Sequence, residues 1–102
     1  MDTILSADSQ ADTQLKDAGQ AQVRRDRLWN VFLWDDHVNA QAYVVFALQR
    51  VFGHSQALAT KLMREAETLG KTVVATEERE QAELHAADLH GYGLQATIGK
   101  FE

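Results

Sequence analysis

The fold of this chain is decided by residues 32–39, which read Phe-Leu-Trp-Asp-Asp-His-Val-Asn. Aromatic and branched apolar residues fill the segment Leu28–Trp34 and charged residues bound it, so we predict a strand that is buried on at least one face. Two adjacent acids, Asp35 and Asp36, follow the strand at its C-terminal end. Capping of the next helix by these acids or by Asn39 is the ordinary interpretation, and a binding or catalytic site is the alternative.

Composition excludes several classes of protein. A chain of 102 residues has the length of one domain, and without cysteine or proline it has no disulfide framework, thiolate zinc site or rigid linker. It contains no apolar run of about 18 residues and no signal-peptide pattern, so we expect a cytoplasmic protein with no membrane contact. A net charge of −5 argues against a nucleic-acid partner, because nucleic-acid binders carry a clustered basic face.

The chain divides into a polar extension and one domain. Residues 1–26 are rich in Ala, Asp, Gln, Ser and Thr and contain few large apolar residues. Burial there cannot offset the entropy that ordering costs, so we predict a flexible, disordered N-terminal extension. Residues 27–102 form the folded domain.

Two helices are predicted after the first strand. Residues 40–52 place large apolar side chains three and four positions apart, which is typical of a helix with one buried stripe. Gly53 ends that helix as a left-handed cap. Ser55 is a suitable N-cap for a second helix that extends to residue 69 and is closed by Gly70.

The remaining elements alternate between strand and helix. Residues 71–75 predict a short central strand, and Thr76 is a suitable N-cap for a third helix. Residues 94–101 alternate apolar and polar side chains, which predicts a half-buried last strand. The order is β-α-α-β-α-β. We therefore predict a single small α+β domain, a three-stranded antiparallel sheet with helices packed on one face.

No metal, cofactor or nucleophile motif is present. His85 and His90 are five residues apart, about 140° from each other around a helix, and no His-x-x-x-His or Glu-x-x-His pair occurs. We expect no metal ion and no cofactor. An acid/base pair of Asp35 with Asp36 or Glu67 stays open as an enzymatic alternative, although a chain this small more often binds than catalyses.

Several unrelated motifs then occur in one order. The strand and its Asp-Asp pair are followed by Ala-Thr-Lys-Leu-Met at residues 59–63, Gly-Lys at 70–71, Arg-Glu-Gln-Ala-Glu at 79–83 and Leu-Gln-Ala-Thr at 94–97. With them the chain resembles ClpS, the adaptor family that hands N-degron substrates to the Clp AAA+ unfoldase and its peptidase. The resemblance covers residues 27–100, and its Trp-Asp-Asp form is similar to one branch of the family. It implies the same fold and a non-enzymatic adaptor.

The resemblance also implies a pocket for a substrate's first residue when that residue is Leu, Phe, Tyr or Trp. Its α-ammonium would be held by Asp35, Asp36, Asn39 and Glu67. Counting back from the helix places Asp35 on the family's Asn, Asp36 on its Asp and Asn39 on its Thr. Counting forward from the strand places Trp34 on the Asn and Asp35 on the Asp instead. We prefer the first register. An ammonium ion needs acceptors in a fixed geometry, which such side chains provide.

The implied apolar pocket differs from the family's usual pattern. Its lining would be Gln41, Val44, Met63, Ala66 and Leu94. Gln41 stands where many members have a Met gate, and Ala66 replaces a larger valine, so we expect a roomier pocket that tolerates a first-residue Trp. Glu67 stands where the family has its α-amine-binding His. Either the chain binds free N-termini with a changed pH dependence, or its pocket has changed ligand.

The resemblance finally implies partners. The third helix would dock on the N-domain of a ClpA- or ClpC-type AAA+ ATPase through Glu80, Glu83 and His85, and His85 stands where Lys is common. We expect a monomer that receives N-degron peptides or proteins. The alternative is a ClpS-like regulator that docks on the ATPase but has lost or altered N-degron recognition, as Glu67 and Gln41 suggest.

Overall fold

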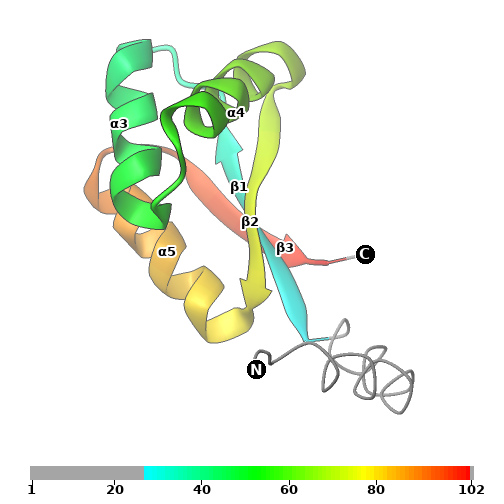
Figure 1. The fold of residues 1–102 in the computed structure, drawn as a ribbon. Helices are drawn as coiled ribbons and strands as arrows, with labels where there is room; N and C mark the ends of the chain where they lie inside the picture. Colours follow the sequence, from blue (N-terminus) through cyan, green and yellow to red (C-terminus); the bar gives the residue numbers. More distant parts are fainter. Residues whose placement is uncertain (1–26, 102) are drawn as a thin grey trace, which may run out of the picture.

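The computed structural model describes residues 27–101, so the predicted flexible extension lies outside the described residues. The elements follow one another in the predicted order, and the α+β fold is confirmed. They are β1 (Leu28–Trp34), α3 (Gln41–Phe52), α4 (Gln56–Leu69), β2 (Lys71–Glu78), α5 (Arg79–Gly91) and β3 (Ala96–Lys100) (Figure 1). Within residues 27–101, no helix is both long enough and apolar enough to cross a bilayer.

The central strand of the sheet is β1. The sheet is antiparallel with the order β2-β1-β3, so the prediction of a central strand over residues 71–75 is wrong. The physical reason is burial: β1 fully buries Val31 and Leu33 on the helix side, whereas β2 buries only Val74. The β1–β2 register shifts after Val31, where β2 has one extra residue, and this bulge lies at Val74.

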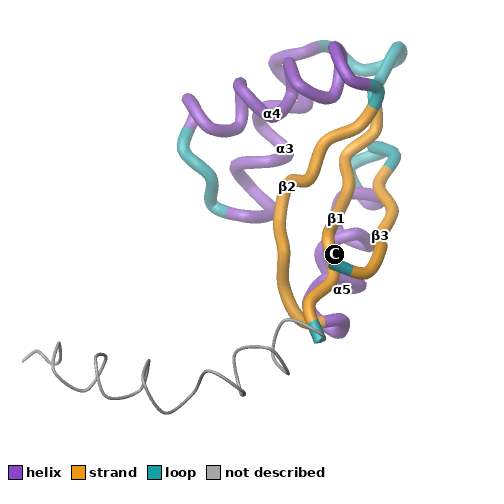
Figure 2. The backbone as a smooth tube through the Cα atoms, turned by 90° about the vertical axis from the view of Figure 1, so that its right-hand side faces the viewer, coloured by secondary structure: helices purple, strands orange, loops and turns teal. Residues whose placement is uncertain are grey.

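The helices lie on one face of the sheet (Figure 2). Helix α5 packs on β1 and β3, α4 packs on β2, and α3 contacts both other helices. The core between these layers consists of Val31, Leu33, Val44, Ala47, Leu48, Ala59, Leu62, Met63, Ala66, Val74, Ala82, Ala86, Leu89, Leu94 and Ala96. Each fully buried leucine among them contributes about 1.5–3 kcal/mol of transfer free energy, so this cluster is the main source of stability.

The ends of α3 and α4 are those that the sequence predicts. Gly53 takes the left-handed conformation with a φ of 73°, which a residue without a side chain adopts at no steric cost. The Ser55 hydroxyl accepts a hydrogen bond from the Leu58 amide at 3.1 Å and caps α4. Gly70 closes α4 with a φ of 92°, and its amide donates to the Ala66 carbonyl at 2.8 Å.

The third helix begins later than predicted. Thr76 is not its N-cap; it lies in β2, and its hydroxyl donates to the Asn30 side-chain oxygen at 2.7 Å. Strand pairing continues to Glu78, which lies opposite Leu28 and becomes the N-cap of α5 without a side-chain capping bond. A cross-strand contact therefore outweighed the capping preference of threonine. The last strand is also shorter than predicted, because it begins at Ala96.

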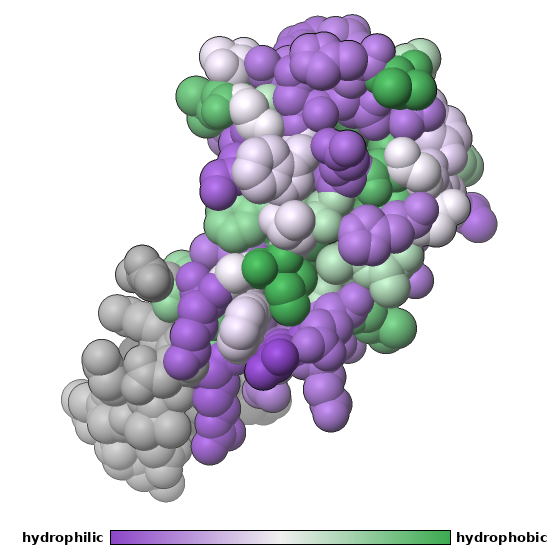
Figure 3. All heavy atoms as spheres, turned by 180° about the vertical axis from the view of Figure 1, so that it is seen from behind, coloured by the Kyte–Doolittle hydropathy of each residue, from purple (hydrophilic) through white to green (hydrophobic). Residues whose placement is uncertain are grey.

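The surface seen from behind Figure 1 is mostly hydrophilic (Figure 3). On that face hydrophobic side chains form only small groups, separated by polar and charged ones. Single exposed apolar residues are normal on a soluble domain and mark no site by themselves. An apolar ligand would therefore not find a large ready-made patch on this face.

Candidate functional site

The loop after β1 is organised around Asp36. One carboxylate oxygen of Asp36 accepts the backbone amides of Val38 at 2.8 Å and Asn39 at 2.7 Å. The other oxygen accepts the Asn39 side-chain amide at 2.9 Å. That amide also donates to the Gly93 carbonyl at 3.3 Å, which ties the loop to the segment before β3. The first strand therefore leads into a turn that one carboxylate holds in place.

These hydrogen bonds do not cap the following helix. The N-cap of α3 is Ala40, and no side chain provides a capping hydrogen bond there. The capping interpretation of Asp35, Asp36 and Asn39 is therefore wrong. The bonds to Asp36 shape the loop itself.

The loop also sets the ionisation of Asp36. Partial burial acts to raise the pKa of this carboxyl, because burial disfavours the charged form. Hydrogen bonds from the Asn39 side chain and from the backbone amides of Asn39 and Val38 act in the opposite direction and outweigh it, with a smaller contribution from His37. The pKa of Asp36 lies below its ordinary value as a result, so this carboxylate is charged at neutral pH.

Asp35 lies outside the pocket that its neighbour lines. The carboxylate of Asp35 lies 3.2 Å from the His37 Nε2, in an ion pair that forms when His37 is protonated. His37 is almost fully exposed, so solvent reaches this pair. Trp34, the residue before Asp35, donates its indole N–H to the Thr97 hydroxyl at 2.9 Å. An indole offers no acceptor, so Trp34 cannot accept a bond from an ammonium ion.

A small cavity lies between the end of β1, the start of α3 and the C-terminal half of α4. Its lining consists of Leu33, Trp34, Asp36, Asn39, Gln41, Val44, Met63, Ala66 and Glu67. The apolar side chains of Leu33, Val44, Met63 and Ala66 are all buried. Gln41 and Glu67 are exposed at the rim. The cavity has buried apolar walls and a polar edge that reaches solvent.

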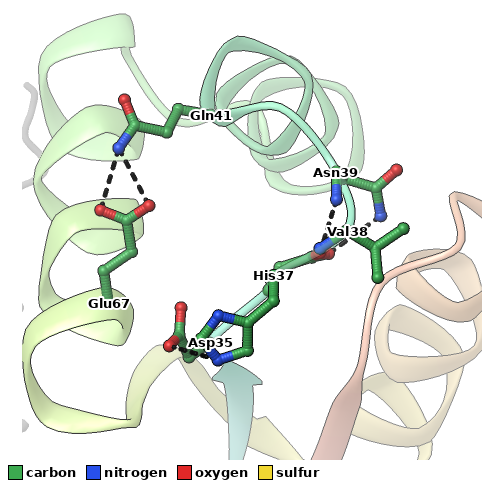
Figure 4. Close-up of polar contacts among 7 residues, drawn as sticks. Asp35, His37, Val38, Asn39, Gln41 and Glu67 are labelled. Carbon is green, nitrogen blue, oxygen red and sulfur yellow. Dashed lines mark hydrogen bonds and ion pairs between the residues drawn. The ribbon is translucent and has the colours of Figure 1, made fainter.

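A polar contact crosses the edge of this cavity. The Gln41 side-chain nitrogen lies 3.0 Å from each carboxylate oxygen of Glu67. Gln41 is the first residue of α3, and Glu67 lies in the last turn of α4, so the contact joins two helix ends (Figure 4). The cavity behind it measures only about 10 Å³, which is about the space that a single water molecule needs.

The structure brings most of the predicted pocket residues together, but not all of them. Asp36, Asn39, Gln41, Val44, Met63, Ala66 and Glu67 share the cavity. Leu94 is buried and lines a neighbouring surface hollow with Trp34 and His90. Leu33 was missed as a wall residue, although its inward position follows from the alternation in β1.

The residues predicted to dock on the ATPase lie on α5. Glu80 and Glu83 are exposed, and Glu83 forms an ion pair of 3.0 Å with Arg79. His85 is different, because its Nδ1 lies 2.6 Å from a carboxylate oxygen of Glu77 and its side chain is only 19% exposed. Within residues 27–101, no group of three or more His, Asp or Glu side chains is placed to hold a metal ion.

The comparisons with known proteins point to one family. The family model for the ATP-dependent Clp protease adaptor protein ClpS matches residues 24–97. The ATP-dependent Clp protease adapter protein ClpS of Mycobacterium tuberculosis is 44% identical over 73 residues, which is 72% of each chain. The corresponding protein of Rhodococcus opacus is 42% identical over 73 residues, which is 72% of this chain and 65% of the relative.

A solved structure agrees with these relatives. Agrobacterium tumefaciens ClpS2 bound to L-phenylalaninamide superposes with a TM-score of 0.65 at 28% identity, covering 72% of this chain and 95% of the solved one. The matched region contains all six described elements apart from the end of β3. The chain therefore belongs to the ClpS family of Clp protease adaptor proteins.

Proposed function

We propose that the cavity beside Glu67 receives the first residue of an N-degron substrate, with its α-ammonium at the polar edge and its Leu, Phe, Tyr or Trp side chain between the apolar walls. As a ClpS adaptor, the chain binds N-degron substrates for delivery to the Clp protease and is not an enzyme. The ligand in the Agrobacterium structure, L-phenylalaninamide, carries both a free α-amine and an apolar side chain.

One observation carries this proposal: buried apolar walls and the side-chain acceptors of Asp36, Asn39 and Glu67 line the same cavity. Val44, Met63 and Ala66 offer the side chain of a first residue a dry surface. Asp36 and Glu67 offer carboxylate oxygens to an ammonium ion at the edge of that surface. A free amino terminus on a bulky apolar residue is the ligand that matches both halves.

The acceptors have capacity left for an ammonium ion. A carboxylate has about four acceptor positions, and the loop uses three of those on Asp36. Among residues 27–101, no hydrogen bond reaches the side-chain oxygen of Asn39, because its contacts use the amide nitrogen. Among the same described residues, Glu67 receives only the amide of Gln41. We assign direct ammonium contacts to these three residues and a more distant electrostatic contribution to Asp35.

We further propose that α5 docks on the N-domain of a ClpA- or ClpC-type ATPase through Glu80 and Glu83. Support comes from their exposure, since a basic partner surface can reach both carboxylates. His85 would contribute mainly by holding Glu77 and the start of α5 in place. Substituting Glu80→Lys together with Glu83→Lys should weaken N-domain binding in calorimetry at least tenfold, whereas Asp88→Lys, a charge reversal on the same helix outside the proposed surface, serves as the control.

Fluorescence anisotropy tests the pocket. A labelled peptide that begins with Leu should bind, and its N-acetylated twin should not, because acetylation removes the positive charge that the acceptors recognise. The two titrations are run on the full chain between about pH 5 and 8. Equal binding of both peptides would contradict the assignment of the ammonium site.

The nearly closed cavity favours one second candidate. A ClpS-like regulator that docks on the ATPase, but whose recognition of N-degrons is lost or altered, would not need an accessible pocket. Absence of binding by either peptide, together with intact binding to the ATPase N-domain, would support that candidate.

A further inference from the structure

The contact between Gln41 and Glu67 lies at the edge of the proposed pocket, and the inference drawn from it rests on the proposed function. The two side chains come from the first residue of α3 and the last turn of α4, and the two distances of 3.0 Å centre one amide group on one carboxylate. Both side chains are exposed, and the apolar walls behind them are buried. The contact therefore lies on the solvent side of the cavity and not at its floor.

The cavity is too small to hold a first residue as it stands. About 10 Å³ accommodates one water molecule at most. An apolar cavity that binds benzene has a volume of about 150 Å³, and a phenylalanine side chain carries a ring of the same size. A first residue cannot enter unless side chains at the mouth move apart. Gln41 and Glu67 are the pair that bridges the two helices there.

The chemistry of the contact resembles that of the proposed ligand. The Gln41 amide donates hydrogen bonds to the Glu67 carboxylate, as an α-ammonium would. The amide satisfies the carboxylate when the pocket is empty, and it lies on both carboxylate oxygens, so an ammonium that takes the same position has to displace it. An ammonium carries a full positive charge and an amide does not, so the ligand can displace the amide from Glu67.

We propose that Gln41 is a specificity-determining latch: its amide competes with the substrate's α-ammonium for Glu67 and keeps the pocket shut until a free N-terminus arrives. The cost of opening this latch lowers the affinity for every first residue. A ligand without a positive charge has to break the bond between Gln41 and Glu67 and offers Glu67 no equivalent donor in return, so it binds poorly. Removing the amide should therefore strengthen binding of free-amine peptides about two- to tenfold, the range expected for one exposed hydrogen bond.

Two substitutions separate the hydrogen bond from simple bulk. Gln41→Ala removes the amide and the side-chain volume, whereas Gln41→Met keeps a similar length without a donor. Both should tighten binding of the Leu-initiated peptide in anisotropy. Gln49→Ala, on the same helix but outside the pocket lining, is the matched control and should leave the affinity unchanged. Stronger binding with Ala but not with Met would show that bulk closes the pocket, and it would overturn the latch.

A measurement without ligand tests the contact independently. In ¹⁵N-correlated NMR spectra of the full chain, the side-chain amide signals of Gln41 should shift in Glu67→Ala, and those of Gln49 should not. Unchanged Gln41 signals would overturn the proposal.

Failure of the latch and failure of the N-degron function are distinguishable. If the wild-type chain binds free-amine peptides and Gln41→Ala binds them no better, the latch is wrong and the N-degron function stands. If wild type and variants all fail to bind, the N-degron function is wrong.

Discussion

The two ends of the β1–β2 pair use the same chemistry in different surroundings. At one end, where Trp34 lies opposite Lys71, the carboxylate of Glu67 contacts an exposed glutamine at the mouth of the pocket. At the other end, where Trp29 lies opposite Glu77, the carboxylate of Glu77 contacts His85. Each acid has one principal partner within the described residues, but only one of the two partners is open to solvent.

The Glu77 end is packed. The side chains of Glu77 and His85 are 16% and 19% exposed, and His85 lies edge-on to the Phe52 ring at 4.8 Å. Phe52 in turn stacks on His54, with 5.1 Å between the ring centroids. The His54 Nε2 donates a hydrogen bond to the Val74 carbonyl at 2.9 Å. The cluster joins the end of α3, the β2 strand and α5, so its acid serves the fold.

The difference shows which acids a ligand can use. A carboxylate enclosed with its partner is costly to separate, because the group left behind is unpaired and poorly solvated. A carboxylate at a solvent-accessible mouth can exchange one donor for another at little cost. We therefore expect Glu77 to contribute to stability and Glu67 to binding, and the following experiments test this division.

The largest effect is expected on stability at the packed end. Glu77→Ala leaves the His85 Nδ1 without its carboxylate partner and should lower the free energy of unfolding by about 2 kcal/mol, the scale of a lost hydrogen bond to a charged group. Glu67→Ala, the matched change at the pocket end, should stay within about 0.5 kcal/mol. Urea denaturation at neutral pH measures both. Equal losses for the two variants would contradict the division.

The next effect is the reverse pattern in affinity. Glu67→Ala should weaken binding of a Leu-initiated peptide about tenfold, or ~1.4 kcal/mol, because the lost ammonium contact outweighs the relief from opening the latch. Glu77→Ala should leave the affinity of the folded protein unchanged. Anisotropy at a temperature where both variants are folded checks this, and a loss with Glu77→Ala as large as with Glu67→Ala would refute it.

Local patterns predicted the fold because each element carries its own signal. Gly53 and Ser55 end and begin helices through contacts within a few residues of the chain, so the sequence contains the information. The prediction that Thr76 caps the third helix was wrong because the partner of its hydroxyl, Asn30, is 46 residues away in the sequence. The prediction of a central strand over residues 71–75 was wrong for the same reason. Which strand is central depends on the pairing of β1 with β2 and β3 along its two edges, and these partners are distant in the sequence.

The residues that line the cavity were largely predictable, but the contacts among them were not. The Asp-Asp pair indicated its place, yet only the loop geometry distinguishes Asp36, which lines the cavity, from Asp35, which turns to His37. The contact from Gln41 to Glu67 spans 26 residues and joins two helix ends, so spacing along one helix gives no sign of it. Side-chain direction at a loop and pairing between helices are properties of the folded chain.

A smaller effect concerns the shape of the pocket. Once opened, a pocket walled by Ala66 should accept a Trp-initiated peptide more tightly than a Leu-initiated one, because the alanine leaves room for a larger ring. Ala66→Val adds two methyl groups and should reduce Trp binding about fivefold, or ~1 kcal/mol, with a smaller effect on Leu. Competition anisotropy gives both affinities, with thermal unfolding as a check on folding. Wild-type affinity for Trp equal to or below that for Leu would contradict this prediction.

The smallest effect is the pH dependence that the loop gives to Asp36. Its pKa in the folded chain lies below the value of about 3.9 for an unfolded aspartate, so the carboxylate stabilises the fold above about pH 4. That contribution is lost as the pH falls through the folded pKa. Asp36→Asn keeps an acceptor for the backbone amides but not the charge, so it should cost about 0.5–1 kcal/mol at pH 6. The difference between the two proteins should shrink in urea denaturation as the pH falls through the folded pKa, because the wild-type carboxyl becomes protonated there. A difference that stays constant throughout this acid titration would mean that the loop does not depend on the charge of Asp36.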